Sequence, residues 1–372
     1  MSTTPAPQSV TRLLGLNLTP GKLRGLQRIS NPNGTLTMVA MDQNSSMISM
    51  ITDSLKKKGE SRAPTFEEIV EAKVLLARAL SPAASAVLVD AYYGVWNSVA
   101  SFAIPPQTGL LIRVEKSGGG KNKHKAPLGE IEAGWSVEKI KRCGADAVKL
   151  LAQFEPRESD SAEHQFQLIQ KVYEDCQKHD ILLLLETVAF PFGTEDKNSA
   201  SFLDRKVETV IESARWLSRY CDIYKAEFPG WLGKHTDAEL ISYNKELDKV
   251  SERPWVLLSA GVDFPQYKKQ VEMSMKCGAS GILGGRAFWK EYFTFDTAEE
   301  RQKFATTTCT GRVGEIHKIV METATPWFAR YGMTMEQLTG MRATENWHFR
   351  YGTSSPTTTG GGAAKPDKDA VY

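Results

Sequence analysis

The sequence lacks the features by which nucleic-acid-binding and membrane proteins are usually recognised. Its 372 residues carry 46 basic and 44 acidic side chains, so the formal net charge is only +2 and no polyanionic partner is indicated. No apolar run approaches the ~18 residues that a bilayer-spanning helix needs. The N-terminal stretch MSTTPAPQSV does not combine a basic segment with an apolar one, as a secretory signal would. We therefore expect neither nucleic acid nor a membrane among the partners of this chain.

Cysteine and histidine are also sparse, and neither forms a recognisable metal motif. The six histidines contain no H-x-x-x-H pair, and no C-x-x-C pair occurs. An odd number of widely spaced cysteines argues against structural disulfides and zinc sites, and favours a reducing, cytoplasmic compartment. The sequence thus predicts no metal and no cofactor. The five cysteines are Cys143, Cys176, Cys221, Cys277 and Cys309.

Both ends of the chain have little to bury. Residues 1–20 begin with a segment rich in Ser, Thr and Pro, and we expect a flexible N-terminus there. The tail over 353–372 reads TSSPTTTGGGAAKPDKDAVY and is predicted to be disordered.

Between these ends, short apolar runs alternate with segments of helical periodicity. The runs are mostly continuous, as expected for strands buried on both faces of a parallel sheet. Helical periodicity is clearest over 66–80, 161–178, 204–220, 237–250 and 265–277. The eight predicted strands are Leu36–Met41, Ala86–Asp90, Leu110–Val114, Ala147–Leu151, Leu182–Glu186, Ile223–Glu227, Val256–Ser259 and Gly281–Gly284.

Eight strand–helix units predict an α/β fold that closes as a (β/α)8 TIM barrel over 21–295. A doubly wound open sheet is the competing arrangement, which the strand count alone does not exclude. The chain continues beyond the eighth strand, with helical segments near Arg312–Arg330 and Met335–Met341. We interpret 296–352 as a C-terminal helical extension that comprises the last barrel helix and an appendage, packed on the barrel or on a partner chain of a homo-oligomer.

Polar side chains close most of these apolar strands, where the active sites of such barrels lie. Lys225 is the most informative, because a lysine amine in a desolvated pocket near other cations can attack a carbonyl carbon. Alternate strands share an interior layer, so Lys149 should supply the neighbouring cation. Glu227 follows Lys225 by two and points the same way. The alternatives are a buried Lys225–Glu227 ion pair, or a lysine that reaches the barrel rim.

Two carboxylates have similar alternative interpretations. Glu186 ends a run of four leucines and is a candidate acid or base, or else the counter-ion of a lysine. Asp42 ends the first strand and faces the site, or else caps the following segment.

The last two strands end in small residues that suit a phosphate. Ser259 and Gly261 follow the seventh strand, while Gly284, Gly285 and Arg286 follow the eighth. Backbone amides can approach an anion there, and the guanidinium adds a two-pronged donor. The alternative is a plain tight turn. The basic stretch SGGGKNKHK over 117–125 lacks the phosphate-loop pattern, and we interpret it as a flexible, solvated loop.

Taken together, these segments resemble the class I tagatose 1,6-bisphosphate aldolase family, to which the sulfofructose-phosphate aldolases are related. The resemblance covers about residues 24–292 and implies a metal-free (β/α)8 aldolase. It places Lys225 at the Schiff-base position, Glu186 at the proton-transfer position, and Asp42 and Lys149 around the carbonyl carbon and hydroxyls. The matching segments are Ala40–Gln43, Val114–Gly118, Gly144–Lys149, Leu185–Glu186, Tyr224–Glu227, Leu258–Val262 and Gly285–Ala287.

We predict the remaining ligand and phosphate contacts at Gln43, Asp90, Arg113, Glu227, Ser259, Gly261, Gly284, Gly285 and Arg286. Two departures from the family point to a substrate different from tagatose bisphosphate. Asn44 stands where the family usually has an arginine after Asp-Gln, and the C-terminal extension exceeds the usual family length.

The sequence therefore predicts a class I aldolase, a lyase, that binds a small phosphorylated sugar. It would cleave or form a phosphorylated ketose resembling tagatose 1,6-bisphosphate, with dihydroxyacetone phosphate and an aldehyde as the two halves. Alternatives are a sulfofructose-phosphate aldolase, or another lysine-dependent barrel lyase or transaldolase. A further alternative is a non-catalytic protein that binds sugar phosphates.

Overall fold

The computed structural model describes residues 10–197, 199–343 and 347–351. The predictions for residues 1–9 and for the tail 353–372 lie outside the described residues. Within them, no helix is long and apolar enough to cross a membrane.

Eight parallel strands close into a barrel, which confirms the predicted (β/α)8 fold and rules out the open sheet. Neighbours around the barrel follow the order β1-β10-β9-β8-β7-β6-β3-β2. The predicted strands match closely, although β6 and β7 run two residues further. The strands are β1 (Leu36–Ala40), β2 (Ala86–Val89), β3 (Gly109–Arg113), β6 (Ala147–Gln153), β7 (Leu182–Val188), β8 (Ile223–Ala226), β9 (Trp255–Leu258) and β10 (Gly281–Gly284).

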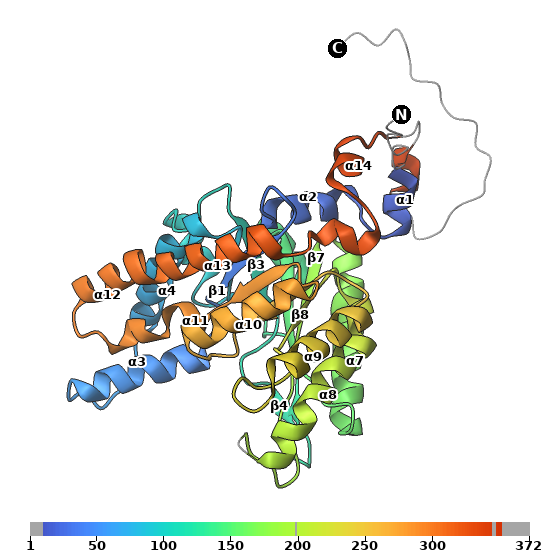
Figure 1. The fold of residues 1–372 in the computed structure, drawn as a ribbon. Coiled ribbons are helices and arrows are strands. Elements are labelled where there is room, and N and C mark those ends of the chain that lie inside the picture. Colours follow the sequence, from blue (N-terminus) through green and yellow to red (C-terminus); the bar gives the residue numbers. More distant parts are fainter. Residues whose placement is uncertain (1–9, 198, 344–346, 352–372) are drawn as a thin grey trace, which may run out of the picture.

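A ring of helices surrounds the barrel, and short elements fill the connections (Figure 1). A two-stranded hairpin of β4 (Gly120–Lys121) and β5 (Pro127–Leu128) lies at one end of the barrel, opposite α1 and α14. The helices are α1 (Val10–Gly15), α2 (Pro20–Ile29), α3 (Ser45–Lys57), α4 (Phe66–Leu80), α5 (Val95–Ala100), α6 (Val137–Arg142), α7 (Ser159–Lys178), α8 (Ala200–Leu217), α9 (Asp237–Val250), α10 (Phe264–Lys276), α11 (Arg286–Trp289), α12 (Ala298–Phe304), α13 (Thr310–Thr323) and α14 (Met335–Thr339).

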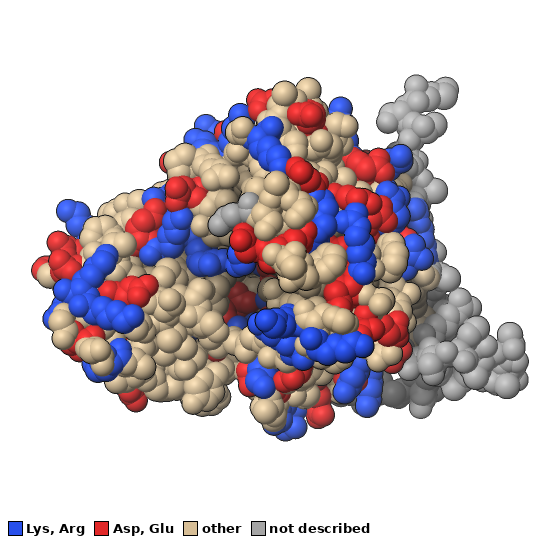
Figure 2. Space-filling view, turned by 90° about the horizontal axis from the view of Figure 1, so that it is seen from below, with Lys and Arg blue, Asp and Glu red and all other residues tan. Residues whose placement is uncertain are grey.

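The interior of the barrel changes from apolar to charged along several of its strands. On β7, Leu182 and Leu184 face inward below Glu186, and on β8 Ile223 lies below Lys225. All charged inward positions therefore gather at the carboxyl end of the strands. Figure 2 views this end, where a hollow opens with acidic atoms (red) at its floor and basic side chains (blue) beside it.

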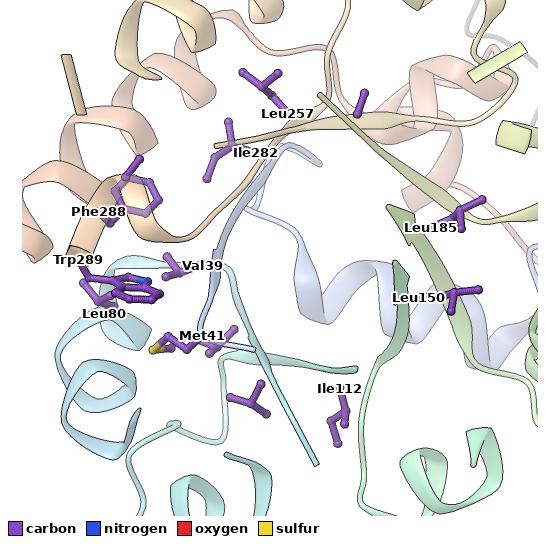
Figure 3. Packing of buried hydrophobic residues seen from close by; sticks show 14 of the residues in the cluster. Val39, Met41, Leu80, Ile112, Leu150, Leu185, Leu257, Ile282, Phe288 and Trp289 are labelled. Carbon is purple, nitrogen blue, oxygen red and sulfur yellow. The ribbon is translucent and has the colours of Figure 1, made fainter. Parts of the chain in front are cut away.

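The outward side chains of the strands form the main core with the helices. Figure 3 shows this layer, in which Val39, Ile112 and Leu185 point away from the barrel interior while Trp289 lies against β1. All four side chains are fully buried. This close-packed layer holds the strand ends rigidly, as a site built on them requires.

The amino end of the barrel is closed by segments from both ends of the chain. Leu13 and Leu18 are buried there, so residues 10–20 do not form the flexible segment predicted over 1–20. Burial of these two leucines offsets the entropy of ordering α1. On α2, Lys22 is fully buried and pairs with Asp222 at 2.8 Å.

The C-terminal region contributes one ring helix before it reaches this amino end. A π-helical turn, Ala305–Cys309, joins α12 to α13, and α13 packs against β1, α4 and α10. The helix predicted near Arg312–Arg330 ends at Thr323, because the backbone before Pro326 disfavours the helical region. The extension predicted from residue 296 thus includes the last barrel helix, as expected.

Candidate active site

A cavity of about 550 Å³ lies at the carboxyl end of the barrel. Every barrel strand except β2 contributes a residue to its wall, either from the strand itself or from the loop that follows it. All the predicted site residues line this cavity except Asp90 and Gly284.

Lys149 lies at the centre of a charged cluster on the cavity floor. Its Nζ contacts Asp42 at 2.9 Å, Glu115 at 2.6 Å and Glu186 at 3.1 Å, so three carboxylates share one ammonium group. Burial alone would lower the pKa of Lys149, but these carboxylates outweigh burial and raise it. Lys149 is therefore a fixed positive charge at neutral pH.

Lys225 reaches the same cluster from β8. Its Nζ lies 3.0 Å from Oε2 of Glu186, the oxygen that also contacts Lys149. The strand that carries Glu186 lies between the strands of the two lysines, so the carboxylate bridges them. Burial would raise the pKa of Glu186, but Lys149 and Lys225 together lower it. Glu186 is thus the ionised counter-ion of both lysines.

Asp42 and Glu115 respond differently to burial in the same cluster. The pKa of Asp42 is lowered, since Lys149, Lys225 and Arg113 outweigh burial. The pKa of Glu115 is raised, because burial outweighs the attraction of Lys149 and Arg113. Within the part of the chain that the structure describes, Oε2 of Glu115 is buried without a hydrogen-bond partner. Asp42 does not cap α3, whose N-cap residue is Asn44.

The small residues after β9 and β10 form one wall of the cavity. Oγ of Ser259 accepts a hydrogen bond from the amide of Gly285 at 3.1 Å, which ties the two loops together. Gly261 has φ +78°, and a Cβ there would lie 2.9 Å from Cζ of Arg286, so glycine allows the guanidinium to approach. Among the described residues, Arg286 forms no ion pair. Gly284 faces Phe288 in the helix layer instead.

Glu227 pairs with a lysine that the sequence analysis did not identify. Its Oε1 lies 2.6 Å from Nζ of Lys206, and its Oε2 accepts the amide of Ala189 at 2.7 Å. The Lys206 ammonium also lies 4.4 Å from the ring centroid of Trp231. The predicted alternative of a Lys225–Glu227 ion pair does not form. Lys206 comes from α8, and strand alternation gives no signal for a residue on a helix.

Asp90 lies behind the cavity wall rather than in it. It is fully buried, and its Oδ1 contacts Nζ of Lys73 at 2.5 Å. Its Oδ2 accepts backbone amides from Tyr92 and Tyr93 at 3.0 Å and 2.8 Å. Asp90 turns away because this lysine and these amides satisfy its charge outside the barrel.

Arg113 and Gln43 line the cavity as predicted, and part of the basic loop pairs in a short hairpin. Arg113 donates to the carbonyl oxygen of Asp42 at 2.7 Å, while Oε1 of Gln43 is buried and finds no hydrogen-bond partner in the described ranges of the chain. The stretch over 117–125 enters the β4–β5 hairpin, and Asn122 holds it to Glu158 at 3.1 Å. Lys121 is exposed, in keeping with the expected solvated surface.

Comparison with known proteins agrees with this architecture. Residues 36–291 match the family described as DeoC/LacD family aldolase. The chain is 31% identical over 333 residues to tagatose 1,6-diphosphate aldolase 2 of Streptococcus agalactiae, covering 84% of this chain and 99% of that protein. It is 30% identical over 329 residues to tagatose 1,6-diphosphate aldolase of Lactococcus lactis, covering 83% and 98%.

Solved structures show the same fold at much lower identity. A fructose-bisphosphate aldolase from Plasmodium falciparum aligns with TM-score 0.60 and 13% identity, covering 87% of this chain and 99% of that one. An archaeal fructose 1,6-bisphosphate aldolase aligns with TM-score 0.51 and 17% identity, covering 80% and 99%. The predicted family, fold and enzyme class are thereby confirmed. The chain belongs to the DeoC/LacD family of aldolases, which are lyases.

Proposed function

We propose that this enzyme is a class I aldolase in which Lys225 forms a Schiff base with a phosphorylated ketose. The observation that carries this proposal is the 3.0 Å contact between Nζ of Lys225 and Glu186 inside a cavity that also holds Lys149. An amine nucleophile needs an adjacent proton acceptor and a desolvated setting. For Lys225, Glu186 is the adjacent acceptor, and the setting is desolvated because the Lys225 side chain is only 5% exposed.

The reaction follows from this geometry. The amine of Lys225 attacks the C2 carbonyl carbon, and loss of water from the carbinolamine gives an iminium ion. The iminium draws electrons from the C3–C4 bond, while the C4 hydroxyl proton passes to Glu186. The bond then breaks, an aldehyde leaves, and the enamine is protonated at C3 and hydrolysed to dihydroxyacetone phosphate. Covalent catalysis of this kind divides one difficult step into easier ones.

The surrounding charges stabilise the intermediates. Lys149 stays charged and lies 3.1 Å from Glu186, so it can hold a hydroxyl oxygen on which negative charge develops. Glu115 keeps a proton more readily than an ordinary glutamate, because burial raises its pKa. Glu186 and Glu115 thus divide proton acceptance and proton donation between two positions.

The phosphate of the dihydroxyacetone half is assigned to the wall made by Ser259, Gly261, Gly285 and Arg286. The guanidinium of Arg286 supplies the charge there. The relatives from Streptococcus agalactiae and Lactococcus lactis are tagatose 1,6-diphosphate aldolases. We therefore assign a ketose 1-phosphate of the tagatose-bisphosphate type to this cavity. All five cysteines are free thiols, in keeping with the cytoplasm, where sugar phosphates are metabolised.

Borohydride trapping tests this proposal. Treatment with dihydroxyacetone phosphate and borohydride should give one covalent adduct, located on Lys225 by peptide mapping. The Lys225→Ala variant should give no adduct and no aldol cleavage while retaining the fold. Lys206→Ala serves as the matched control, because Lys206 also lines the cavity but pairs with Glu227. An adduct that persists in Lys225→Ala would overturn the assignment of the nucleophile.

A further inference from the structure

Lys73 lies on α4, outside the barrel wall, yet it is bonded to the loop that carries Asp42. Its side chain is 1% exposed. Its Nζ donates to the carbonyl oxygen of Met41 at 2.9 Å, to Oδ1 of Asn44 at 2.8 Å and to Oδ1 of Asp90 at 2.5 Å. An ammonium group has three hydrogens, so all three are used.

These bonds fix the backbone on one side of Asp42. The Met41 carbonyl belongs to the peptide that precedes Asp42, and Lys73 holds it from outside the barrel. The Asp42 carbonyl belongs to the peptide that follows, and Arg113 holds it from inside at 2.7 Å. With both flanking peptides held, the Asp42 carboxylate is directed at Lys149, 2.9 Å away. Side chains in active sites need such support to keep a productive geometry.

Stability alone does not account for a lysine at this position. Burial lowers the pKa of Lys73, although Asp90 opposes this effect, so the charged amine is held against a desolvation cost. A buried ion pair is often no more stabilising than well-packed apolar residues of similar volume. An apolar side chain could fill the space, but it could not donate to the Met41 carbonyl.

We propose that Lys73 is a positioning residue for aldol cleavage, which holds Asp42 against Lys149 through the Met41 carbonyl and the Asn44–Asp90 pair. This inference rests on the proposed function, since its readout is cleavage of a ketose phosphate. Asp90 then serves as the counter-ion of Lys73 rather than as a ligand contact. Asn44 joins the same network, because its Nδ2 donates to Asp90 at 3.4 Å.

The molecule offers a matched control at the opposite end of the barrel. Lys22 on α2 is also fully buried, and it donates to Asp222 at 2.8 Å and to Gln177 at 3.0 Å. Lys22→Met and Lys73→Met each remove one buried ammonium group that pairs with an aspartate. Both should lower the free energy of unfolding, but only Lys73→Met should affect catalysis. We expect kcat to fall about tenfold or more in Lys73→Met, because small displacements of reacting groups are costly.

A second pair of readouts separates positioning from stability. In Lys73→Met/Asp90→Asn the unpaired buried charge is removed, so stability should recover while kcat stays low. The pH profile of kcat should also shift in Lys73→Met. Lys149 and Lys225 lower the pKa of Glu186 and Asp42 raises it, so displacement of Asp42 moves the acid limb to lower pH.

The outcomes are distinct. The proposal is overturned if kcat of Lys73→Met stays at the wild-type value, or if kcat recovers together with stability in the double variant. It is equally overturned if Lys22→Met, at equal folded fraction, loses as much kcat as Lys73→Met. A wild-type enzyme that neither cleaves ketose phosphates nor forms an adduct would instead contradict the proposed function itself.

Discussion

Two glutamates on either side of Lys149 have pKa values that move in opposite directions. Burial raises the pKa of Glu115, since Lys149 and Arg113 only partly offset it. Burial acts on Glu186 too, but Lys149 and Lys225 together reverse it and lower its pKa. Glu186 contacts both Lys149 and Lys225, whereas Glu115 contacts Lys149 and has Arg113 only as a nearby charge. Two carboxyl groups whose pKa values are shifted in opposite directions are typical of sites that need both an acid and a base.

These opposite shifts predict opposite effects of two isosteric substitutions on stability. Glu115 binds its proton more tightly in the folded state, so its contribution to stability is complete below pH 4.5 and declines as pH rises through the folded pKa. Glu115→Gln mimics the protonated acid and should exceed the wild type in unfolding free energy at pH 7. The difference should vanish below pH 4.5, as measured by urea unfolding between pH 4 and 8.

Glu186→Gln is the matched control, because the sign reverses. The lowered pKa of Glu186 contributes stability above its ordinary value of 4.5, and this contribution is lost as pH falls through the folded pKa. Glu186→Gln should therefore be less stable than the wild type at pH 7 and approach it in acid. Two variants that shift stability in the same direction would contradict the assigned protonation states.

The strand positions of the site could be predicted from the sequence, but its helix positions could not. Lys149, Glu186 and Lys225 lie at inward positions near the ends of parallel strands, where the alternation of side chains determines which way they point. Lys73 and Lys206 reach the site region from helices. Whether a helix lysine is exposed or directed inward depends on how the helix packs, which no local pattern in this chain specifies.

At the scale of elements, α4 both covers the barrel and carries Lys73. Its start was predicted correctly, because Thr65 and Glu68 form a capping box. The same box begins α9 at Thr236 and Glu239. Each box satisfies backbone amides that the helix itself leaves without partners.

Removal of the cap should test how far fraying of α4 extends toward the site. Thr65→Ala should lower the free energy of unfolding by about 1 kcal/mol, as cap substitutions usually do. Thr236→Ala in α9 should cost about the same amount. Lys73 lies two turns into the helix, so kcat should be unchanged in both variants. A lower kcat in Thr65→Ala alone, at full folded fraction, would show that the first turn supports Lys73.

Other elements were missed for identifiable reasons. The segment ATTTCTG over 305–311 contains poor helix formers, yet it connects α12 to α13 through a π-helical turn. Its buried members, Ala305 and Cys309, pack on the core, and tertiary packing overrides local propensity there. At the N-terminus, α2 has a Pro–Gly start that resembles a turn, but Thr19 caps it and Leu26 and Ile29 are buried beneath.

At the scale of the whole molecule, the two ends of the barrel differ in structure and in role. The carboxyl end holds the charged cluster and the cavity, while the amino end is closed by an apolar cluster from both ends of the chain. Trp327, Phe328 and Tyr331 from the C-terminal region pack in that cluster with residues of α1 and α2. The extension therefore seals the barrel, whereas its part in a homo-oligomer stays a prediction.

This separation predicts that damage to the amino end affects stability and spares catalysis. Trp327 is 4% exposed, and Trp327→Ala should cost about 3–5 kcal/mol of unfolding free energy, as truncation of a buried tryptophan does. The KM for a ketose phosphate should be unchanged at a temperature where the variant remains folded. Trp216→Ala is the control, because Trp216 is 51% exposed and its removal should cost far less. A change in KM in Trp327→Ala would show that the closed end of the barrel influences the open one.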